Sequence, residues 1–319
     1  MSAQHRDSAA PAPRSSSTLK ALAGVGVVGG AAGLGMLAYA NRVGLTRFTT
    51  RFPQLDVLPT EGPLRILHIS DIHYVPGQQK KFQWLQSLAD LKPDLVINTG
   101  DNLSHPDAVD EVLEALAPLR RLPGAYVPGS NDYFAPQLKN PLRYLVSPSG
   151  IPHQPVELPW RRLFAGFDSS GWVNLSNRHH AMTIGHLAVH LSGVDDPHIG
   201  RDRFSGWPEG QSAEPTLKIG VAHAPVGAIL RTFAATGADL ILAGHTHGGQ
   251  VCLPGGRALT TNCDLPTSQA SGVSTVTSAS GRRTPLHVSA GIGTSATAPI
   301  RFNCPPEASV LDLFPAPSS

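Results

Sequence analysis

The stretch Ala243-Gly244-His245-Thr246-His247-Gly248-Gly249-Gln250 directly follows the apolar run Ala238-Asp239-Leu240-Ile241-Leu242. An apolar strand that ends in a tight, glycine-rich turn can direct two imidazoles, here His245 and His247, toward one point. Taken alone, the same pattern is just as typical of an ordinary polar turn. The strand ends elsewhere in the chain decide between these two interpretations.

Four other apolar runs, at residues 64–70, 94–99, 125–127 and 217–222, are predicted strands that also end in polar side chains. Segments with helical spacing lie among them, at 79–91, 106–119 and 226–235. This alternation predicts parallel βαβ units and an α/β fold, in which ligands gather at the carboxyl ends of the strands. The polar residues just past the five strand ends are Asp71, His73, Asp101, Asn131, Asp132, His223, His245 and His247. We therefore expect one cluster of these side chains.

The ligand types in this cluster predict a metal centre. Carboxylates, imidazoles and a carboxamide suit Mn, Fe, Zn or Co, and no thiolate is present to favour a structural zinc site. The number of ligands exceeds what one ion needs and fits two divalent metal ions that share a bridging carboxylate. Two-metal sites serve phosphoryl transfer, so the expected substrate is a phosphate ester.

At these residues the sequence resembles the calcineurin-like metallophosphoesterases, over about residues 64–314 and in the family's motif order. Asp71-Ile72-His73 resembles the first motif, Gly100-Asp101-Asn102 the second, Gly129-Ser130-Asn131-Asp132 a variant of the third, His223 the fourth, and Gly244-His245-Thr246-His247 the last. The resemblance implies a two-sheet β-sandwich flanked by helices.

The resemblance also implies a set of metal ligands. Asp71, His73 and His247 would hold one ion, and Asn131, His223 and His245 would hold the other. Asp101 would bridge the two ions, together with a hydroxide that attacks phosphorus in line.

The third motif departs from the family pattern, which is Gly-Asn-His followed by an acid. Without a gap, Ser130 takes the ligand position, whereas a shift of one residue keeps Asn131 as the ligand. We prefer the shift, because a carboxamide oxygen is a much better neutral ligand than a serine hydroxyl. Either alignment lacks the histidine, and general acid–base help of this kind is typically worth ~10²–10⁴-fold in rate.

His105 follows Asp101 by a few residues and is a candidate to replace the missing imidazole. It fits equally well as part of the loop before a helix that starts at Pro106. The candidate catalytic residues are therefore Asp101, Asn131 and His105.

Several other polar residues have two interpretations. The turn Asp195-Asp196-Pro197-His198 either lines the substrate cleft or caps a hairpin predicted over 175–194. We expect Asp132 to orient a neighbour, and Arg301 is a weak candidate for a phosphate contact. The three cysteines, Cys252, Cys263 and Cys304, lack the spacing of a metal site. We expect all three to be small, buried residues of the core.

The chain as a whole divides into four parts. Residues 1–20 are rich in Ser, Ala and Pro and predict a disordered N-terminus. Residues 21–40 carry no charge and would span about 30 Å as a helix, which predicts a transmembrane or signal-anchor segment. Residues 41–62 are predicted to be a linker, and 63–316 the catalytic domain. Within that domain, 255–284 is predicted to be a long surface loop, and 286–290 and 308–314 closing strands.

These features predict a membrane-anchored or exported hydrolase, with its catalytic domain outside the cytoplasm. The formal net charge of +2 gives no reason to expect a nucleic-acid partner. The expected reaction is hydrolysis of a phosphodiester or phosphomonoester, and a tether suggests a lipid-linked or cell-envelope substrate. The alternative is a catalytically impaired module that binds metal and phosphate, since the histidine of the third motif is absent.

Overall fold

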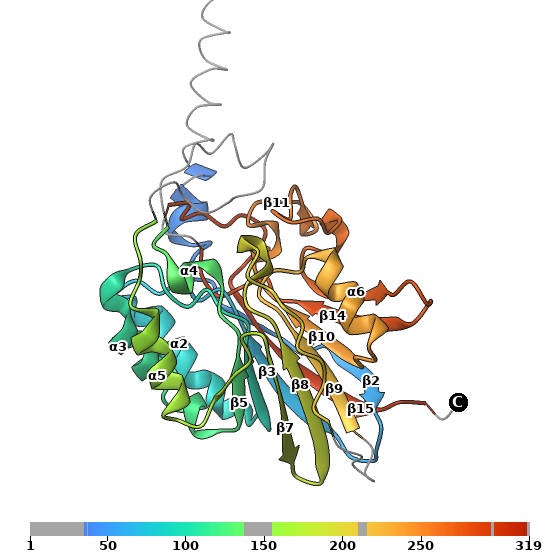
Figure 1. Ribbon diagram of the computed structural model, residues 1–319. Coiled ribbons are helices and arrows are strands. Elements are labelled where there is room, and N and C mark those ends of the chain that lie inside the picture. The colour runs from blue at the N-terminus through green and yellow to red at the C-terminus, as the bar shows by residue number, and fades with distance from the viewer. Residues whose placement is uncertain (1–34, 37, 137–154, 210–215, 295–296, 318–319) are drawn as a thin grey trace, which may run out of the picture.

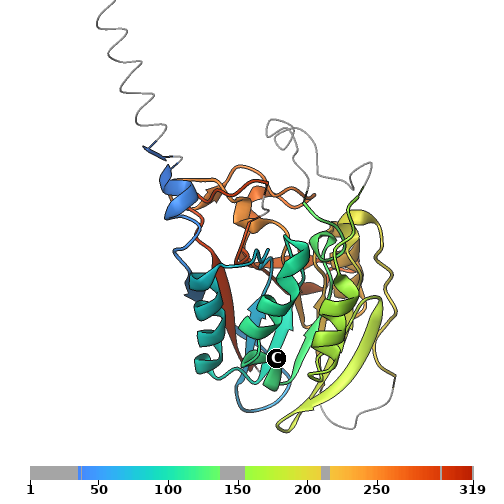
Figure 2. The same cartoon turned by 90° about the vertical axis from the view of Figure 1, so that its left-hand side faces the viewer.

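The computed structural model of the protein describes residues 35–36, 38–136, 155–209, 216–294 and 297–317. Two β-sheets pack face to face between two layers of helices (Figure 1). Helices α2 (Gln79–Ser87), α3 (Val109–Ala115) and α5 (Trp160–Asp168) cover one sheet, and α6 (Gly227–Ala235) covers the other. Figure 2 shows the first three helices side by side in front of their sheet. The predicted α/β fold with two sheets is therefore confirmed.

The first sheet has the strand order β1-β15-β3-β4-β5-β6, and β2 also pairs with β15. Its strands are β1 (Thr49–Arg51), β2 (Gln54–Leu58), β3 (Leu64–Ile69), β4 (Leu95–Asn98), β5 (Gly124–Tyr126), β6 (Val173–Asn174) and β15 (Glu307–Pro315). Strands β3 to β6 run parallel, whereas β15 is antiparallel to β3. The carboxyl ends of β3, β4 and β5 therefore meet at one edge.

The second sheet has the order β13-β14-β10-β9-β8-β7. Its strands are β7 (Arg178–Ile184), β8 (Leu187–Gly193), β9 (Thr216–Val221), β10 (Leu240–Ala243), β13 (Gly272–Thr277) and β14 (Arg283–Val288). The four central strands are parallel, and β7 and β13 are antiparallel edges. The β7–β8 pair confirms the predicted hairpin.

Short elements connect the strands. They are η1 (Leu88–Leu91), η2 (Pro106–Ala108), η3 (Leu119–Arg121), α4 (Ser130–Tyr133), η5 (Pro197–Ile199), η6 (His247–Gly249), β11 (Cys252–Leu253), β12 (Arg257–Ala258) and η7 (Thr267–Gln269). Strands β11 and β12 form a separate two-stranded ribbon.

Alternation along each inner strand divides the apolar core into layers. In β3, Leu64 and Ile66 pack between the two sheets, whereas Leu67 and Ile69 pack against the helices on the outer face. A third cluster, which includes Phe233 of α6, fills the space between α6 and the second sheet. Because successive strand residues point to opposite faces, an apolar strand can serve two core layers at once. This packing fixes the strand ends that carry the polar residues.

Two segments differ from the sequence-based expectation. Residues 41–62, predicted to be a linker, contain β1 and β2, and both strands pair with β15. The segment 255–284, predicted to be a long loop, contains β12, η7 and β13. Both regions form edge strands with one solvent-facing side, so their sequences are too polar to stand out as apolar runs.

The predicted transmembrane or signal segment at 21–40 lies mostly outside the described residues, as does the predicted disordered stretch 1–20. Within the described ranges, no helix has the length and apolar character needed to cross a membrane.

Candidate metal centre

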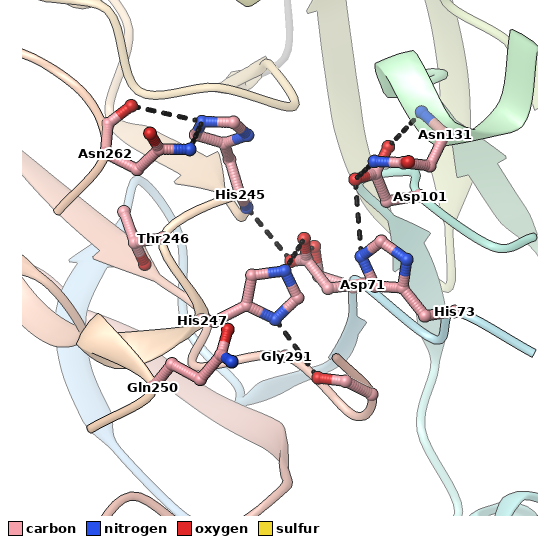
Figure 3. Close-up of polar contacts among 12 residues, drawn as sticks. Asp71, His73, Asp101, Asn131, His245, Thr246, His247, Gln250, Asn262 and Gly291 are labelled. Atoms are coloured by element: carbon pink, nitrogen blue, oxygen red, sulfur yellow. Dashed lines mark hydrogen bonds and ion pairs between the residues drawn. The ribbon is translucent and has the colours of Figure 1, made fainter. Parts of the chain in front are cut away.

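The seven candidate ligands predicted from the sequence lie just past strand ends of both sheets. The first sheet contributes Asp71 and His73 after β3, Asp101 after β4 and Asn131 in α4 after β5. The second sheet contributes His223 after β9 and both His245 and His247 after β10. Contacts between neighbouring members join all seven into one network, part of which Figure 3 shows. The structure thus places the predicted cluster at one edge of the sandwich.

One group within the network consists of Asp71, His73 and His247. Their ligand atoms lie within 4.8 Å of one another. His247 Nε2 is 3.6 Å from Asp71 Oδ1, and the rings of His73 and His247 have centroids 5.0 Å apart. These are the three residues that the resemblance implies for one ion, and they can converge on one cation.

The second group is centred on Asp101. The ligand atoms of Asp71, Asp101 and His223 lie within 4.8 Å of one another, so Asp71 belongs to both groups. Asp101 Oδ2 is 3.4 Å from His73 Nε2 and 3.5 Å from His223 Nε2. His245 Nδ1 lies 3.3 Å from His223 Nε2. Asp101 therefore stands between histidines of both sheets, as a bridging carboxylate would.

Asn131, rather than Ser130, lies against Asp101. Its backbone N–H donates to Asp101 Oδ1 at 2.8 Å, and its amide Nδ2 donates to Asp101 Oδ2 at 2.7 Å. A Cβ at Gly129 would lie 2.7 Å from His223 Nε2, so the first position of the third motif has room only for glycine. The placement of Asn131 supports the shifted alignment of the third motif.

Polar partners behind the cluster orient its side chains. His223 Nδ1 donates to the carbonyl of Thr99 at 2.7 Å, and His247 Nδ1 lies 3.1 Å from the carbonyl of Gly293. A donor bond from Nδ1 leaves Nε2 with its lone pair free for a metal. The sequence did not reveal these partners, because backbone carbonyls carry no side-chain signal.

Two serines have a similar role. Ser104 Oγ lies 3.0 Å from His73 Nδ1, and Ser70 Oγ donates to Asp71 Oδ2 at 2.6 Å. Ser70 directly precedes the first motif and Ser104 follows the second by two residues, and this closeness is the one sequence signal that could have identified them.

Asp132 orients its neighbours, as expected. Its fully buried carboxylate accepts from the backbone N–H groups of Gly129, Asp101 and Asn102 at 2.8–2.9 Å. Burial and the nearby Asp101 carboxylate raise the pKa of Asp132 to about 6. The side chain therefore ties the second motif to the third, which sets the position of Asp101 relative to Asn131.

The backbone at the cluster is strained. Five candidate ligands have positive φ angles: Asp71 at 51°, His73 at 44°, Asp101 at 56°, His245 at 69° and His247 at 51°. A left-handed backbone is uncommon outside glycine and costs roughly 1–3 kcal/mol per residue. Such strain persists only where the surrounding packing enforces it, and it is concentrated here at the predicted site.

Burial sets the charge of the histidines. It lowers the pKa of His73 and of His247 to about 3 and holds the pKa of His245 well below its usual range. These imidazoles are neutral, which is the form that binds metal. Burial also acts to lower the pKa of His223, but the Asp101 carboxylate outweighs it and holds that pKa well above its usual range. His223 therefore holds a second proton, on Nε2 beside this carboxylate, and a bound cation would take the place of that proton.

The donor set fits divalent cations. Asp71 Oδ1 and His73 Nε2 are buried and have no hydrogen-bond partner within the described part of the chain. Burial raises the pKa of Asp71, because its negative charge lies out of contact with water. Buried polar atoms without partners are costly, and a bound cation would satisfy both. Carboxylate oxygen and neutral imidazole nitrogen are ligands for Mn, Fe, Zn or Co.

His105, the third candidate catalytic residue, is at the start of η2. Its Nδ1 accepts from the Asp107 backbone N–H at 3.2 Å, and its side chain is 44% exposed. It thus forms part of the loop before the Pro106 helix, and its contacts do not connect it with the seven ligands in the described residues. A role at the leaving group stays a prediction.

The turn after β8 lies close to the cluster. The ring of His198 has its centroid 4.4 Å from that of His245. Asp196 is fully buried, and its carboxylate caps η5 by accepting from the His198 N–H at 2.8 Å. Burial raises the pKa of this carboxyl group to about 7. The turn therefore caps η5 and not the predicted hairpin, and its His198 lies beside a candidate ligand, so a place in the substrate cleft stays a prediction.

The side chain of Arg301 is buried, and both of its terminal nitrogens donate to backbone oxygens, whereas Nε has no hydrogen-bond partner in the described part of the chain. Its Nη2 donates to the carbonyls of Ala290, Gly291 and Gly293 at 2.7–2.9 Å, and Nη1 donates to the carbonyl of Cys304 at 3.2 Å. These contacts give Arg301 a role in connecting backbone segments, and a contact with phosphate stays a prediction.

Comparison with known proteins agrees with this geometry. The model of the family described as calcineurin-like phosphoesterase matches residues 64–249, more than half of the 319 residues. The chain belongs to this family, and the resemblance found in its motifs is confirmed.

Two relatives illustrate the match. The protein named "Uncharacterized metallophosphoesterase YkoQ" from Bacillus subtilis (strain 168) is 27% identical over 210 residues, which cover 65% of this chain and 69% of that protein. The protein named "Transmembrane protein with metallophosphoesterase domain" from Bos taurus is 26% identical over 232 residues, which cover 68% of this chain and 47% of that protein. The chain thus spans less than half the length of the bovine relative.

A solved structure, TT1561 of Thermus thermophilus, is 12% identical and has a TM-score of 0.41, over 72% of this chain and 91% of that chain. This likeness is distant.

Proposed function

We propose that the protein is a phosphoric ester hydrolase that uses two divalent metal ions. The observation that carries the proposal is the pair of ligand groups, Asp71 with His73 and His247, and Asp71 with Asp101 and His223. The two groups share the carboxylate of Asp71. The carboxylate of Asp101 also connects them, because its Oδ2 lies within 3.5 Å of Nε2 of both His73 and His223. Family membership supports the same reaction class.

Two bound ions would supply Lewis-acid activation of water and neutralisation of the charge that develops on the phosphoryl oxygens. The chain's own residues have the other tasks. Asp71, His73 and His247 would hold the first ion, and Asn131, His223 and His245 would hold the second. Asp101 would serve both. Ser104 and the carbonyls of Thr99 and Gly293 keep the imidazoles in the required orientation. The positions of the ligands are thus set before substrate binds.

The proposed substrate is a phosphodiester or phosphomonoester at a membrane or in the cell envelope. The support is the uncharged segment 21–40 and the bovine relative, whose name describes it as a transmembrane protein. The catalytic domain would lie outside the cytoplasm. Hydrolysis of soluble nucleotides without any activity on lipid-linked or envelope phosphates would contradict this assignment.

The test uses the full chain, purified in mild detergent and reconstituted with Mn²⁺. Hydrolysis of bis-p-nitrophenyl phosphate is compared with that of the monoester, and bound metal is counted by elemental analysis. We expect turnover with about two ions per chain. Asp101→Asn should lose turnover, whereas the matched control Asp110→Asn, at a surface ion pair with Arg162, should keep it.

The second candidate function is metal and phosphate binding without catalysis. The observation in its favour is the third motif, which contains Ser130 and Asn131 where the family pattern has asparagine and histidine. Two bound ions without turnover on either ester would favour this candidate. Failure to bind metal would exclude both functions.

A further inference from the structure

Cys252 and Cys304 are two thiols that lie against the backbone of the turn that carries His247. Cys252 begins β11, and Cys304 lies just before β15. Both are free thiols and both are buried. We propose that these two cysteines are a disulfide-forming pair that joins β11 to the segment 301–304. The cross-link does not depend on the hydrolase activity.

The two sulfurs share one backbone oxygen. Cys252 Sγ donates to the carbonyl of Gly248 at 3.2 Å, and Cys304 Sγ lies 3.5 Å from the same oxygen. Hydrogen bonding between the two thiols raises the pKa of Cys252 and lowers the pKa of Cys304. Two sulfurs that lie against one oxygen, each carried by a different segment, are neighbours that a small local movement can bring to disulfide distance.

The surrounding backbone holds the two segments together. The Cys252 N–H donates to the carbonyl of Phe302 at 2.9 Å, and Asn303 Nδ2 donates to the carbonyl of Cys252 at 3.3 Å. Val251 and Phe302 form an isolated parallel bridge. A bond between the sulfurs therefore needs little movement of either backbone.

The pair has a small apolar environment. Cys252 and Cys304 cluster with Ala258, Ala270 and Ala290, and a Cβ at Gly248 would lie 2.7 Å from Cys304 Sγ. The third cysteine, Cys263, belongs to a different loop and is absent from this cluster. The chain thus provides an internal control for nonspecific oxidation.

Formation of the cross-link consumes one low-molecular-weight disulfide. The sulfur of one cysteine attacks this oxidant, forms a mixed disulfide and releases one thiol. The second cysteine then attacks the protein sulfur of the mixed disulfide and releases the other thiol. One S–S bond forms in the protein as one S–S bond of the oxidant breaks, and the two thiol hydrogens leave with the two products.

The cross-link closes a loop of about 50 residues, which restricts the unfolded chain and stabilises the folded one. We expect the oxidised protein to melt at least about 5 °C above the reduced protein.

Tryptic peptides give a direct test. Cleavage after Arg231, Arg257, Arg282 and Arg301 places each cysteine in a different peptide, 232–257, 258–282 and 302–319. The folded full chain is equilibrated with oxidised glutathione, free thiols are blocked with N-ethylmaleimide, and the peptides are identified by mass spectrometry. We expect a cross-link between peptides 232–257 and 302–319, and an alkylated Cys263.

Variants link the bond to the stability. Cys263→Ala should keep both the cross-link and the increase in Tm, whereas Cys252→Ala and Cys304→Ala should lose both. The wild-type peptide map decides the matter even where an alanine variant fails to fold. Cross-links that involve Cys263, or alkylation of both Cys252 and Cys304 in folded protein at high oxidised glutathione, would overturn the proposal.

Discussion

Asn131 tests the assignment of the third motif at the scale of one residue. Its amide and backbone nitrogens both contact the Asp101 carboxylate, and no contact of Ser130 with that carboxylate is seen in the described structure. We expect Asn131→Ala to lower kcat/KM by roughly 100-fold and to reduce the bound metal, since a ligand and a partner of the bridging carboxylate are lost together. Metal titration and steady-state kinetics measure the two effects.

Ser130→Ala is the matched control, because it removes a neighbouring polar group of the same motif. It should leave metal content unchanged and activity within a few-fold of wild type. The opposite ranking of the two variants would favour the ungapped alignment, in which Ser130 is the ligand.

Asp132 provides a second prediction at this scale. Asp132→Asn keeps the shape of the side chain but replaces one acceptor oxygen by a donor, which then faces the backbone N–H groups of Asp101 and Gly129 or of Asn102. We expect about 10–100-fold weaker metal binding, since partners that orient ligands typically have effects of this size. Isothermal titration with Mn²⁺ measures it. Unchanged affinity would show that Asp132 has no part in positioning Asp101.

Sequence reasoning identified the candidate ligands at this scale and missed most of their partners. Asp71, His73 and Asp101 were recognisable because a strand end and a motif coincide there. The carbonyls of Thr99 and Gly293 were not, since any residue offers a carbonyl and only the fold determines which one faces an imidazole.

Arg301 acts at the scale of elements, because it connects the loops that surround the cluster. Its guanidinium donates to the carbonyls of Ala290, Gly291, Gly293 and Cys304. The carbonyl of Gly293 also faces His247. Arg301→Lys should lower the free energy of unfolding by about 2–3 kcal/mol, since one ammonium cannot satisfy all of these oxygens. Urea unfolding measures the change.

The control for this variant is Arg282→Lys, where the arginine side chain is 45% exposed and pairs with Asp239. Its expected effect is below about 1 kcal/mol, as for surface ion pairs in general. Equal effects of the two substitutions would contradict the proposed role of Arg301.

A pair of buried histidines joins the two sheets and predicts a pH dependence. His68 Nδ1 in β3 lies 2.9 Å from His287 Nδ1 in β14, and His68 Nε2 lies 2.9 Å from Thr99 Oγ1. Burial lowers the pKa of His287 to about 4, and burial together with His287 holds the pKa of His68 well below its usual range. Both imidazoles are therefore neutral in the folded protein.

The unfolded chain, with histidine pKa values near 6.5, binds more protons than the folded chain between about pH 6.5 and 4. The free energy of unfolding should therefore fall as the pH falls through this window, by at most about 3 kcal/mol for His287. His287→Gln should weaken this dependence, and His186→Gln in the exposed β7–β8 turn should not. Urea unfolding at several pH values, with chelator present, measures it. An identical acid dependence in wild type and His287→Gln would contradict the prediction.

At this scale, the inner strands and the helices α2, α3 and α6 were predicted from the sequence, whereas α5 and the edge strands were not. Strands β3, β4, β9 and β10 are apolar over most of their length, because both of their faces are covered. Strand β13 exposes alternate residues, and its Ser, Thr and Gly content is equally typical of a loop. Its pairing with β14 depends on a neighbour that local sequence does not reveal.

At the scale of the whole molecule, the proposed ions would join the two sheets. Asp71, His73 and Asp101 belong to the first sheet, and His223, His245 and His247 to the second. Removal of metal with EDTA should therefore lower Tm, since ligands that bind only the folded state stabilise it. Differential scanning calorimetry, with Mn²⁺ added back as the control, measures the effect. A Tm unaffected by EDTA in protein shown to have contained metal would contradict it.

The order of the layers was predictable from family resemblance, whereas the path of the chain into the first sheet was not. Strand β15 lies inside that sheet and pairs with β1, β2 and β3. The sequence of 308–314 predicts a strand, but only long-range pairing decides that it separates β3 from the strands contributed by 49–58.

This position of β15 has a consequence for biosynthesis. On a translating ribosome, β3, β4 and β5 emerge long before residues 307–315. The edge of β3 that pairs with β15 therefore stays unpaired until β15 has been made. Strands β1 and β2, although made earlier still, have nothing to pair with until then. We expect chaperones to bind the nascent chain over this interval and so prevent its aggregation. The first sheet should become complete only after residue 315 has left the exit tunnel.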